Sequence, residues 1–245
     1  MFQPIVCPNC GAAISNMDVR LMEVAQCAYC KASFRVPRSF TPEPDLGDLL
    51  LGADFNAIAD IPGWQRLSLE RTRTLYGPPP ALLAEMPASD LVHYALQSSG
   101  LFDDFDASVS IRFMDGALNY IRGGLVLRYN PKQGGYVFFV SPQRTYMIGF
   151  YHYVDDKIAW GGELISWTEH TALQQGFDVV NRLRVVLYGE QCRVYFNGVL
   201  ATALRLDKFS LGQVRLGLES TVHSKIAIAF SDLQLREVPP EMRRR

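Results

Sequence analysis

Short apolar runs of strand length alternate with turn residues along most of this chain, from about residue 48 to residue 238. The runs are rich in Val, Ile, Leu, Phe and Tyr, and Gly, Pro, Asn or Asp separates them, which is typical of β-strands joined by tight turns. The clearest runs are 106–114, 123–130, 135–140, 145–154, 181–189 and 225–235. No stretch of sequence of useful length has the periodicity of an amphipathic helix, and we expect at most one turn of helix at "PPALLAEM" (79–86). Strands must bury their apolar faces against each other, so the pattern predicts two packed antiparallel sheets, a β-sandwich or jelly roll.

The strongest hairpin signal lies in "CRVYFNGVLATAL" (192–204). Asn197 and Gly198 separate two strand-like runs, and Asn-Gly supplies the positive φ angles of a type I′ turn. Alternation along the first run puts Cys192, Val194 and Phe196 on one face. We therefore expect Cys192 to be a small buried apolar residue and not a nucleophile.

The other four cysteines form two matched pairs near the start of the chain. Their pattern is Cys-x2-Cys-x16-Cys-x2-Cys, with Cys7, Cys10, Cys27 and Cys30. Two residues between cysteines allow both sulfurs to face one ion, and four thiolates complete a closed tetrahedral zinc shell. The spacing predicts a structural zinc ribbon over residues 1–36, with room for a short hairpin between the pairs. The alternatives are two disulfides, four free cysteines, or iron in a similar ligand set.

A proline-rich stretch, "VPRSFTPEPDLGD" (36–48), follows the second pair and favours extended backbone. We assign residues 37–47 to a linker, 48–238 to the β-sandwich and 239–245 to a basic C-terminal tail, which we expect to be solvated. The ribbon's few basic residues are offset by its acids and by the thiolates. Nucleic-acid binding, which needs a basic face, is therefore not expected.

The whole chain of 245 residues has a formal net charge of −1, which argues against broad attraction to nucleic acid or anionic lipid. About half of the residues (48%) are apolar, but their runs are too short to cross a bilayer. The first residues have no basic stretch followed by an apolar run, so we expect no secretory signal. We expect a cytoplasmic protein, whose clustered thiols are free to bind metal.

The order of several motifs resembles the concanavalin A-like lectin/glucanase superfamily, and within it the laminin-G-like domains and a bacterial group with sugar-processing hydrolases. The motifs are "GADFNAIADIPGWQ" (52–65), "LFDDFDASVSIRF" (101–113), "GGLVLRYN" (123–130), "GGYVFFVSPQRTYMIGFY" (134–151), "LISWTEHTALQQGFDVVNRLRVVLYGEQCRVYFNGVL" (164–200), "GQVRLGLE" (212–219) and "IAFSDLQL" (228–235). The resemblance implies a jelly roll with one concave sheet. Members of the superfamily include lectins, glycoside hydrolases and protein-contact domains, so the fold alone does not decide function.

A large glucanase branch of the superfamily carries Glu-x-Asp-x-x-Glu on a concave strand, where one carboxylate attacks and another protonates the leaving group. No such pattern occurs here. The nearest acidic pair is Glu163 and Glu169, with no acid between them. Asp155 and Asp156 could serve a calcium-binding loop, but adjacent acids in a turn are usually solvated.

Aromatic residues give the best candidates for a ligand or partner surface, because sugar sites combine flat rings with a few polar groups. In 145–154, alternation puts Tyr146, Ile148, Phe150 and His152 on one face, and Met147, Tyr151 and Tyr153 on the other. We select Arg128, Tyr151, Tyr153 and Trp167 as candidate surface residues, and expect Arg128 to point to the wet concave face. The competing interpretation is that the aromatic rings are sandwich core.

These observations predict a mainly β protein, with a zinc ribbon joined to a lectin-like sandwich. Because no catalytic constellation is evident, the sequence favours a non-catalytic binding or scaffolding protein that docks a protein or glycan partner. The alternative is a carbohydrate-active protein, a lectin or glycoside hydrolase, that uses the concave face. The only cofactor expected is structural zinc.

Overall fold

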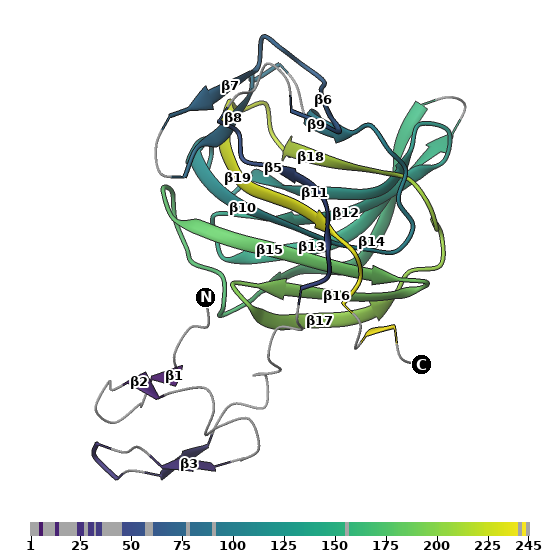
Figure 1. Ribbon diagram of the computed structural model, residues 1–245. Coiled ribbons are helices and arrows are strands. Elements are labelled where there is room, and N and C mark those ends of the chain that lie inside the picture. The colour runs from purple at the N-terminus through teal and green to yellow at the C-terminus, as the bar shows by residue number, and fades with distance from the viewer. Residues whose placement is uncertain are drawn as a thin grey trace.

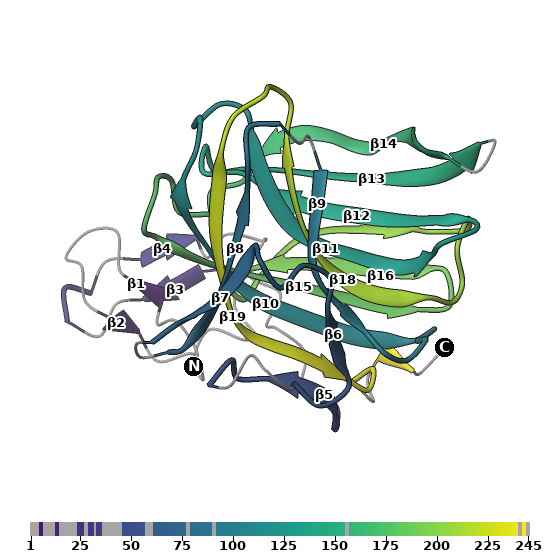
Figure 2. The same cartoon turned by 90° about the horizontal axis from the view of Figure 1, so that it is seen from above.

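A computed structural model describes residues 5–6, 13–14, 24–26, 29–31, 33–35, 46–56, 61–76, 79–89, 92–154, 157–239 and 242–243. Within these residues, the part from 46 onward forms two large antiparallel sheets (Figures 1 and 2). Sheet I runs in the order β17 (Val199–Arg205), β16 (Gln191–Phe196), β15 (Val180–Tyr188), β10 (Phe105–Asp115), β19 (Ile226–Arg236), β8 (Ala81–Met86) and β7 (Thr72–Leu75), and β5 (Leu49–Ala53) also pairs with β19.

Sheet II runs in the order β14 (Lys157–Glu169), β13 (Thr145–Val154), β12 (Gly134–Val140), β11 (Ile121–Asn130), β18 (Gln213–Ser220), β9 (Val92–Ser98) and β6 (Trp64–Arg66). The chain passes repeatedly from one sheet to the other, for example between β10 and β11, β14 and β15, β17 and β18, and β18 and β19, so strands distant in sequence become neighbours. This crossing pattern is jelly-roll-like. The predicted two-sheet antiparallel sandwich is confirmed.

The main core lies between the sheets and follows from the alternation along each strand. On β10, Ala107, Val109, Ile111 and Phe113 are all buried in this core. They face side chains of sheet II such as Leu125 of β11. Full burial of each Val, Leu, Ile or Phe side chain contributes about 1.5–3 kcal/mol. The sandwich is therefore stabilised mainly by this inter-sheet layer.

The expected strands match the structure closely, and 145–154 coincides with β13. The exception is 79–86, where we expected at most a helical turn. Residues 81–86 form strand β8, paired with β19 on one side and β7 on the other. Leu82, Ala84 and Met86 are buried in the core. Pairing on both edges outweighs the helical preference of Ala, Leu, Glu and Met.

The hairpin predicted at Asn197 and Gly198 joins β16 to β17, and both residues have positive φ, 50° and 84°. Cys192 on β16 is 1% exposed, as expected of a small core residue. Burial raises the pKa of its thiol, which disfavours the reactive thiolate. The local sequence signals in this segment were therefore sufficient to predict both the hairpin and the burial of Cys192.

Two short hairpins occur in the N-terminal region. β1 (Ile5–Val6) pairs with β2 (Ala13–Ile14), and β3 (Val24–Gln26) pairs with β4 (Ser33–Arg35). Each Cys-x2-Cys pair falls in the sequence between the strands of one hairpin. The strands β2 and β3, which lie between the two cysteine pairs in the sequence, pair with β1 and β4 respectively. Most of the segment between the pairs, where the spacing leaves room for a hairpin, lies outside the described residues.

Of the predicted zinc ligands, Cys7, Cys10 and Cys27 lie outside the described residues, and Cys30 lies in the turn after β3. Lys31, which follows Cys30, has a φ of 61°. In the first pair the corresponding position is occupied by glycine, the residue that adopts positive φ without steric cost. Both pairs thus precede a residue suited to, or held in, a tight turn.

The end of the chain differs from the solvated tail that we expected. Val238 and Met242 are 2% and 5% exposed, and they pack on Val186 and Tyr195 of sheet I. Arg243 donates through Nε to the Val238 carbonyl at 2.9 Å. Val238 was assigned to the sandwich, but for Met242 the prediction was wrong, because apolar contacts hold it on the sheet. Among the described residues, no helix is long and apolar enough to cross a membrane.

Candidate functional site

A second layer of aromatic and apolar side chains lies on sheet II, apart from the inter-sheet core. Its buried members are Val126, Tyr129, Val137, Phe139, Met147 and Tyr151, and Tyr94, Tyr153 and Trp167 pack against them. On β13 the alternation sends Tyr146 and Ile148 to the core and Met147 and Tyr151 to this layer. The predicted division of the two β13 faces is confirmed. We call this surface the outer face of sheet II.

Glycines bring aromatic rings close to the backbone on this face. A Cβ atom added at Gly149 would lie 2.4 Å from Cη2 of Trp160, on the neighbouring strand β14. A Cβ atom at Gly217 would lie 3.1 Å from the ring of Phe139. The rings therefore occupy space that a side chain at either position would take. Trp160 remains 42% exposed and meets the Tyr151 ring edge-on, at 5.2 Å between centroids.

An ion pair crosses the outer face. Arg122 on β11 donates through Nη2 to Oε1 of Glu219 on β18, at 2.5 Å. The other carboxylate oxygen, Oε2, accepts the hydroxyl of Tyr151 at 3.0 Å. The guanidinium of Arg122 also lies 5.2 Å from the centre of the Trp167 ring, within range of a cation–π contact. Glu219 is thus held between two donors from different strands.

A second arginine stacks on tyrosines. The guanidinium of Arg215 on β18 lies 3.6 Å from the centre of the Tyr129 ring and 5.1 Å from that of Tyr94. Its Nη2 donates to Oε1 of Gln97 at 2.7 Å. The hydroxyls of Tyr129 and Tyr153 share a hydrogen bond of 2.6 Å. The rings on this side of the face are fixed by stacking and by hydrogen bonds.

Three tyrosines of this face, Tyr94, Tyr129 and Tyr151, are held in the protonated form. Burial raises the pKa of Tyr151, and the nearby Glu219 carboxylate raises it further. Burial likewise raises the pKa of Tyr94. Burial, together with the hydrogen bond shared with Tyr153, raises the pKa of Tyr129 to about 12. At neutral pH these groups are therefore neutral phenols, able to donate hydrogen bonds.

Several buried donors on the face have no hydrogen-bond partner among the described residues. They are the Tyr94 hydroxyl, Nε of Arg122 and Nε of Arg215. A buried polar group without a partner costs about 1–3 kcal/mol, so most such groups in proteins are satisfied. Their gathering on one face marks it as a place where acceptor atoms would be stabilising.

Three of the four candidate surface residues meet on this face, namely Tyr151, Tyr153 and Trp167. Arg128 does not. Its side chain is 1% exposed, and its guanidinium donates to the carbonyls of Asp103 and Gly189 at 2.7 and 2.8 Å from Nη2, and to that of Phe209 at 3.1 Å from Nη1. The expectation that Arg128 points to a wet face was wrong.

The reason is a β-bulge. The pairing of β11 shifts register on both sides at this point, and Arg128 has a φ of 49°. Strict alternation would place Arg128 on the same face as Val126. Because of the bulge, Tyr129 takes that place on the outer face, and Arg128 turns toward the loops that it ties together.

Five residues of this face were not predicted from the sequence: Arg122, Arg215, Glu219, Tyr94 and Tyr129. A signal was present in "VRLGLE" (214–219), where Arg215, Gly217 and Glu219 alternate with the buried Val214, Leu216 and Leu218. Polar residues at every second position of a core strand indicate a second, non-core face. Their partners lie far away in the sequence, and the pairs could not be inferred from spacing.

Glu163, Glu169 and Glu219 do not form the closely paired arrangement of a glycosidase. Glu163 and Glu169 both lie on β14, and Glu169 forms an ion pair with Arg144. Glu163 lies opposite Gly149 on β13. Its strand, β14, is four strand spacings away from β18, which carries Glu219, and this corresponds to roughly 19 Å across the sheet. Glycosidase carboxylates lie about 5–9.5 Å apart. The sheet order does not set Glu163 beside Glu219.

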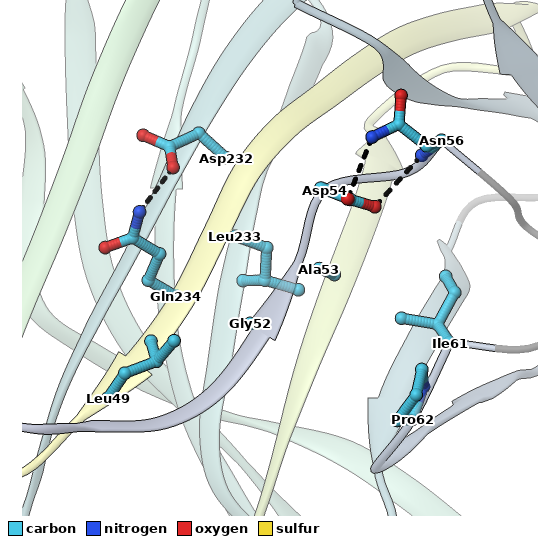
Figure 3. A pocket seen from close by; sticks show the side chains of 10 residues that line it. All are labelled: Leu49, Gly52, Ala53, Asp54, Asn56, Ile61, Pro62, Asp232, Leu233 and Gln234. Atoms are coloured by element: carbon cyan, nitrogen blue, oxygen red, sulfur yellow. Dashed lines mark hydrogen bonds between the residues drawn. The ribbon is translucent and has the colours of Figure 1, made fainter.

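A cavity of about 520 Å³ lies elsewhere, where β5 meets β19 (Figure 3). Its polar side chains bind one another. The Asp54 carboxylate accepts from the Asn56 side chain at 2.8 Å, which holds the pKa of Asp54 below its usual value. Asp232 accepts from Gln234 at 2.5 Å and pairs with Arg182. These groups are already satisfied, so the outer face of sheet II is the better candidate site.

No metal-binding cluster of three or more His, Cys, Asp or Glu side chains is found among the described residues. That description does not include Cys7, Cys10 and Cys27, nor the acidic pair Asp155 and Asp156 considered for calcium.

No protein-family model matches the chain. No curated protein sequence matches it either. Solved structures do match. The carbohydrate-binding module CBM66 from Bacillus subtilis shares 15% identity, with 71% of this chain and 96% of that one covered and a TM-score of 0.51. A glycoside hydrolase family 16 endo-glucanase from Bacteroides ovatus shares 10%, with 76% and 100% covered and a TM-score of 0.57.

The β-glucanase of Bacillus licheniformis shares 9% identity, with 79% of this chain and 100% of that one covered and a TM-score of 0.54. The sandwich shares the fold of these solved structures. At such low identities the likeness shows the fold alone, because the same sandwich carries many functions. Function has to be argued from the outer face of sheet II.

Proposed function

We propose that the sandwich is a non-catalytic carbohydrate-binding module and that the outer face of sheet II is its ligand surface. The observation that carries this proposal is the gathering of Trp160, Trp167 and Tyr151 with Arg122 and Glu219 on one sheet face. Sugar sites combine flat rings with a few placed polar groups, and this face offers both. The structural likeness to a named carbohydrate-binding module supports the proposal.

Trp160 and Trp167 supply the stacking surface. Trp160 is 42% exposed although it packs on Tyr151, so one part of its ring is free to contact a sugar. Trp167 is half-buried beside Arg122. The apolar C–H face of a pyranose matches an exposed indole, and neighbouring Arg and Gln side chains hydrogen bond to its hydroxyls.

The non-catalytic part of the proposal rests on Glu219. Both of its oxygens are engaged, one by Arg122 and one by Tyr151. A carboxylate that acts as nucleophile or acid needs a free oxygen at the scissile bond and a second carboxylate nearby. Glycoside hydrolysis is the alternative, in which substrate would displace one of these contacts.

The experiment is a glycan array followed by titration calorimetry with the sugars that bind. Trp160→Ala and Trp167→Ala should each weaken binding at least about tenfold, the equivalent of about 1.4 kcal/mol. Tyr76→Ala is the matched control, because Tyr76 is 88% exposed and follows β7 of sheet I. Equal losses with Tyr76→Ala, or no binding to any glycan, would contradict the proposal. In the second case a protein partner becomes the target of the search.

Hydrolysis is tested separately by the release of reducing ends from every glycan that binds. We expect none above the level of buffer. Hydrolysis that is lost in Glu219→Gln, while glycan binding is kept, would show that the protein is a glycoside hydrolase and not a binding module.

We further propose that Cys7, Cys10, Cys27 and Cys30 hold a structural zinc ion in a cytoplasmic protein. The support is the ligand spacing, the pairing of β1 with β2 and of β3 with β4 around the two cysteine pairs, and the positive φ of Lys31. When bound, zinc would tie two hairpins that are too short to fold on an apolar core.

Elemental analysis of the purified protein should find one zinc per chain, and Cys10→Ser should remove it. Chelation should make residues 1–36 sensitive to protease while the sandwich keeps its thermal transition, because the sandwich has its own core. Cys192→Ser is the control, since Cys192 is buried in the sandwich. Full zinc content in Cys10→Ser, or loss of the sandwich transition on chelation, would contradict the proposal.

A further inference from the structure

Arg215 differs from Arg122, on the same face, in having no acidic partner among the residues that the structure describes. Arg122 is neutralised by Glu219 at 2.5 Å. The contacts of Arg215 among the described residues are with neutral groups: the rings of Tyr94 and Tyr129, and the side-chain oxygens of Gln97 and Gln213 at 2.7 and 3.5 Å. Within the described part of the chain, the positive charge of Arg215 is therefore without a counterion.

The position of Arg215 makes this charge more than a solvated surface cation. Its side chain is half-buried, and its guanidinium is stacked on Tyr129. Loss of water around the group lowers its pKa, which reports the cost of holding the charge there. A guanidinium stays protonated in proteins, so this cost is relieved by an anion and not by deprotonation.

Unsatisfied donors lie around the same charge. Nε of Arg215 and the hydroxyl of Tyr94 are both buried without a hydrogen-bond partner in the described structure. The Arg215 guanidinium lies 5.1 Å from the centre of the Tyr94 ring, so the two residues are neighbours. Two donors and a positive charge together favour a group with two acceptor oxygens and a negative charge, the chemistry of a carboxylate.

On the basis of the proposed function, we propose that the ligand is an acidic glycan, one built from uronic acids, and that Arg215 binds the carboxylate of one sugar unit. A uronic acid offers an apolar ring face for a tryptophan and a carboxylate for a guanidinium. The outer face of sheet II presents both kinds of group, with Trp160 on β14 and Arg215 on β18. The separation of these strands suits a chain of sugars better than a single one.

The test compares oligosaccharides of galacturonic, glucuronic and mannuronic acid with their carboxyl-reduced forms, which keep the sugar chain and lose the charge. Titration calorimetry with the full-length protein should show at least about tenfold tighter binding to an acidic form than to its reduced form. A difference of this size is what one charge-assisted hydrogen bond contributes. The preference should shrink as salt is raised from low to physiological concentration.

Substitutions at Arg215 test whether the preference for acidic glycans depends on this residue. Arg215→Gln should abolish the preference for the acid, and Arg215→Lys should retain part of it, because the charge stays and the forked geometry is lost. Arg193→Gln is the matched control, since Arg193 lies on β16 of sheet I. Thermal melts show whether each variant is folded, and Arg215→Lys keeps the test usable if Arg215→Gln is not.

The possible outcomes distinguish a failure of this inference from a failure of the proposed carbohydrate-binding function. Binding to neutral glycans with no preference for the acids overturns the role of Arg215 and leaves the carbohydrate-binding module standing. A preference that survives in Arg215→Gln overturns the assignment of the carboxylate to Arg215. Binding to no carbohydrate, acidic or neutral, overturns both.

Discussion

The hydroxyl of Tyr151 on β13 donates to Oε2 of Glu219 on β18 at 3.0 Å, although β12 and β11 lie between their strands. The two side chains meet above the outer face, over residues of the intervening strands such as Val126 and Phe139, which are fully buried. The contact therefore ties four strands together and covers the apolar layer beneath it.

Removing this hydroxyl should destabilise the sandwich. Tyr151→Phe leaves Oε2 of Glu219 without its donor, and we expect the free energy of unfolding to fall by about 1–3 kcal/mol. Urea unfolding followed by tryptophan fluorescence measures the change. Tyr120→Phe serves as the control because Tyr120 is 47% exposed, and it should change stability by less than about 0.5 kcal/mol. Equal effects of the two variants would mean that the contact contributes nothing.

The buried tyrosines should make the protein sensitive to alkali. Burial raises the pKa of Tyr129 to about 12, whereas an unfolded tyrosine titrates near about 10. The unfolded chain then binds fewer protons than the native one between these values, so stability is full below about pH 10 and falls as pH rises toward about 12. The free energy of unfolding can fall by at most about 1.4 kcal/mol per pH unit for each such tyrosine.

Urea unfolding at a series of pH values from about 8 to about 11 measures this fall. Tyr129→Phe should reduce the slope, because one group that titrates differently in the two states is gone. A stability that stays level through this range would show that the phenols ionise equally in the folded and unfolded protein.

Arg128 should matter for stability and not for ligand binding. It is 1% exposed and joins three loop carbonyls, those of Asp103, Gly189 and Phe209. Arg128→Ala removes a buried guanidinium and its hydrogen bonds to these three carbonyls, of which that of Phe209 is buried, and we expect a loss of about 3 kcal/mol or more. Arg205→Ala is the matched control, because the Arg205–Glu190 pair is exposed and such pairs contribute about 0–1 kcal/mol. A stable Arg128→Ala that has lost only its ligand would return Arg128 to the binding surface.

The strands were predictable because period-two patterns and turn residues are local signals. The match of 145–154 to β13 and the Asn197-Gly198 turn depend on nothing outside those segments. Residues 81–86 show the limit of local reasoning: their composition favours a helix, and the neighbours β7 and β19 impose a strand.

The candidate site was predictable only in part, and for the same reason. Tyr151 and Tyr153 followed from alternation on one strand, whereas Glu219 is 68 positions from Tyr151. Arg128 was misplaced by a single bulge, because one extra residue exchanges the two faces of a strand. Whole-sheet pairing, which no local pattern contains, decides which polar residues meet.

The C-terminal segment should stabilise sheet I. Met242 is 5% exposed and lies with Val238 on Val186 and Tyr195. The neighbouring pair Arg184–Asp106 is also buried, and the Arg184 guanidinium lies 5.5 Å from the centre of the Tyr195 ring. Met242→Ala should lower the free energy of unfolding by about 2 kcal/mol or more through lost burial and a cavity. Leu211→Ala is the exposed control, at 46% exposure. A melting temperature unchanged in Met242→Ala would show that the segment leaves the sheet in solution, as a solvated tail would.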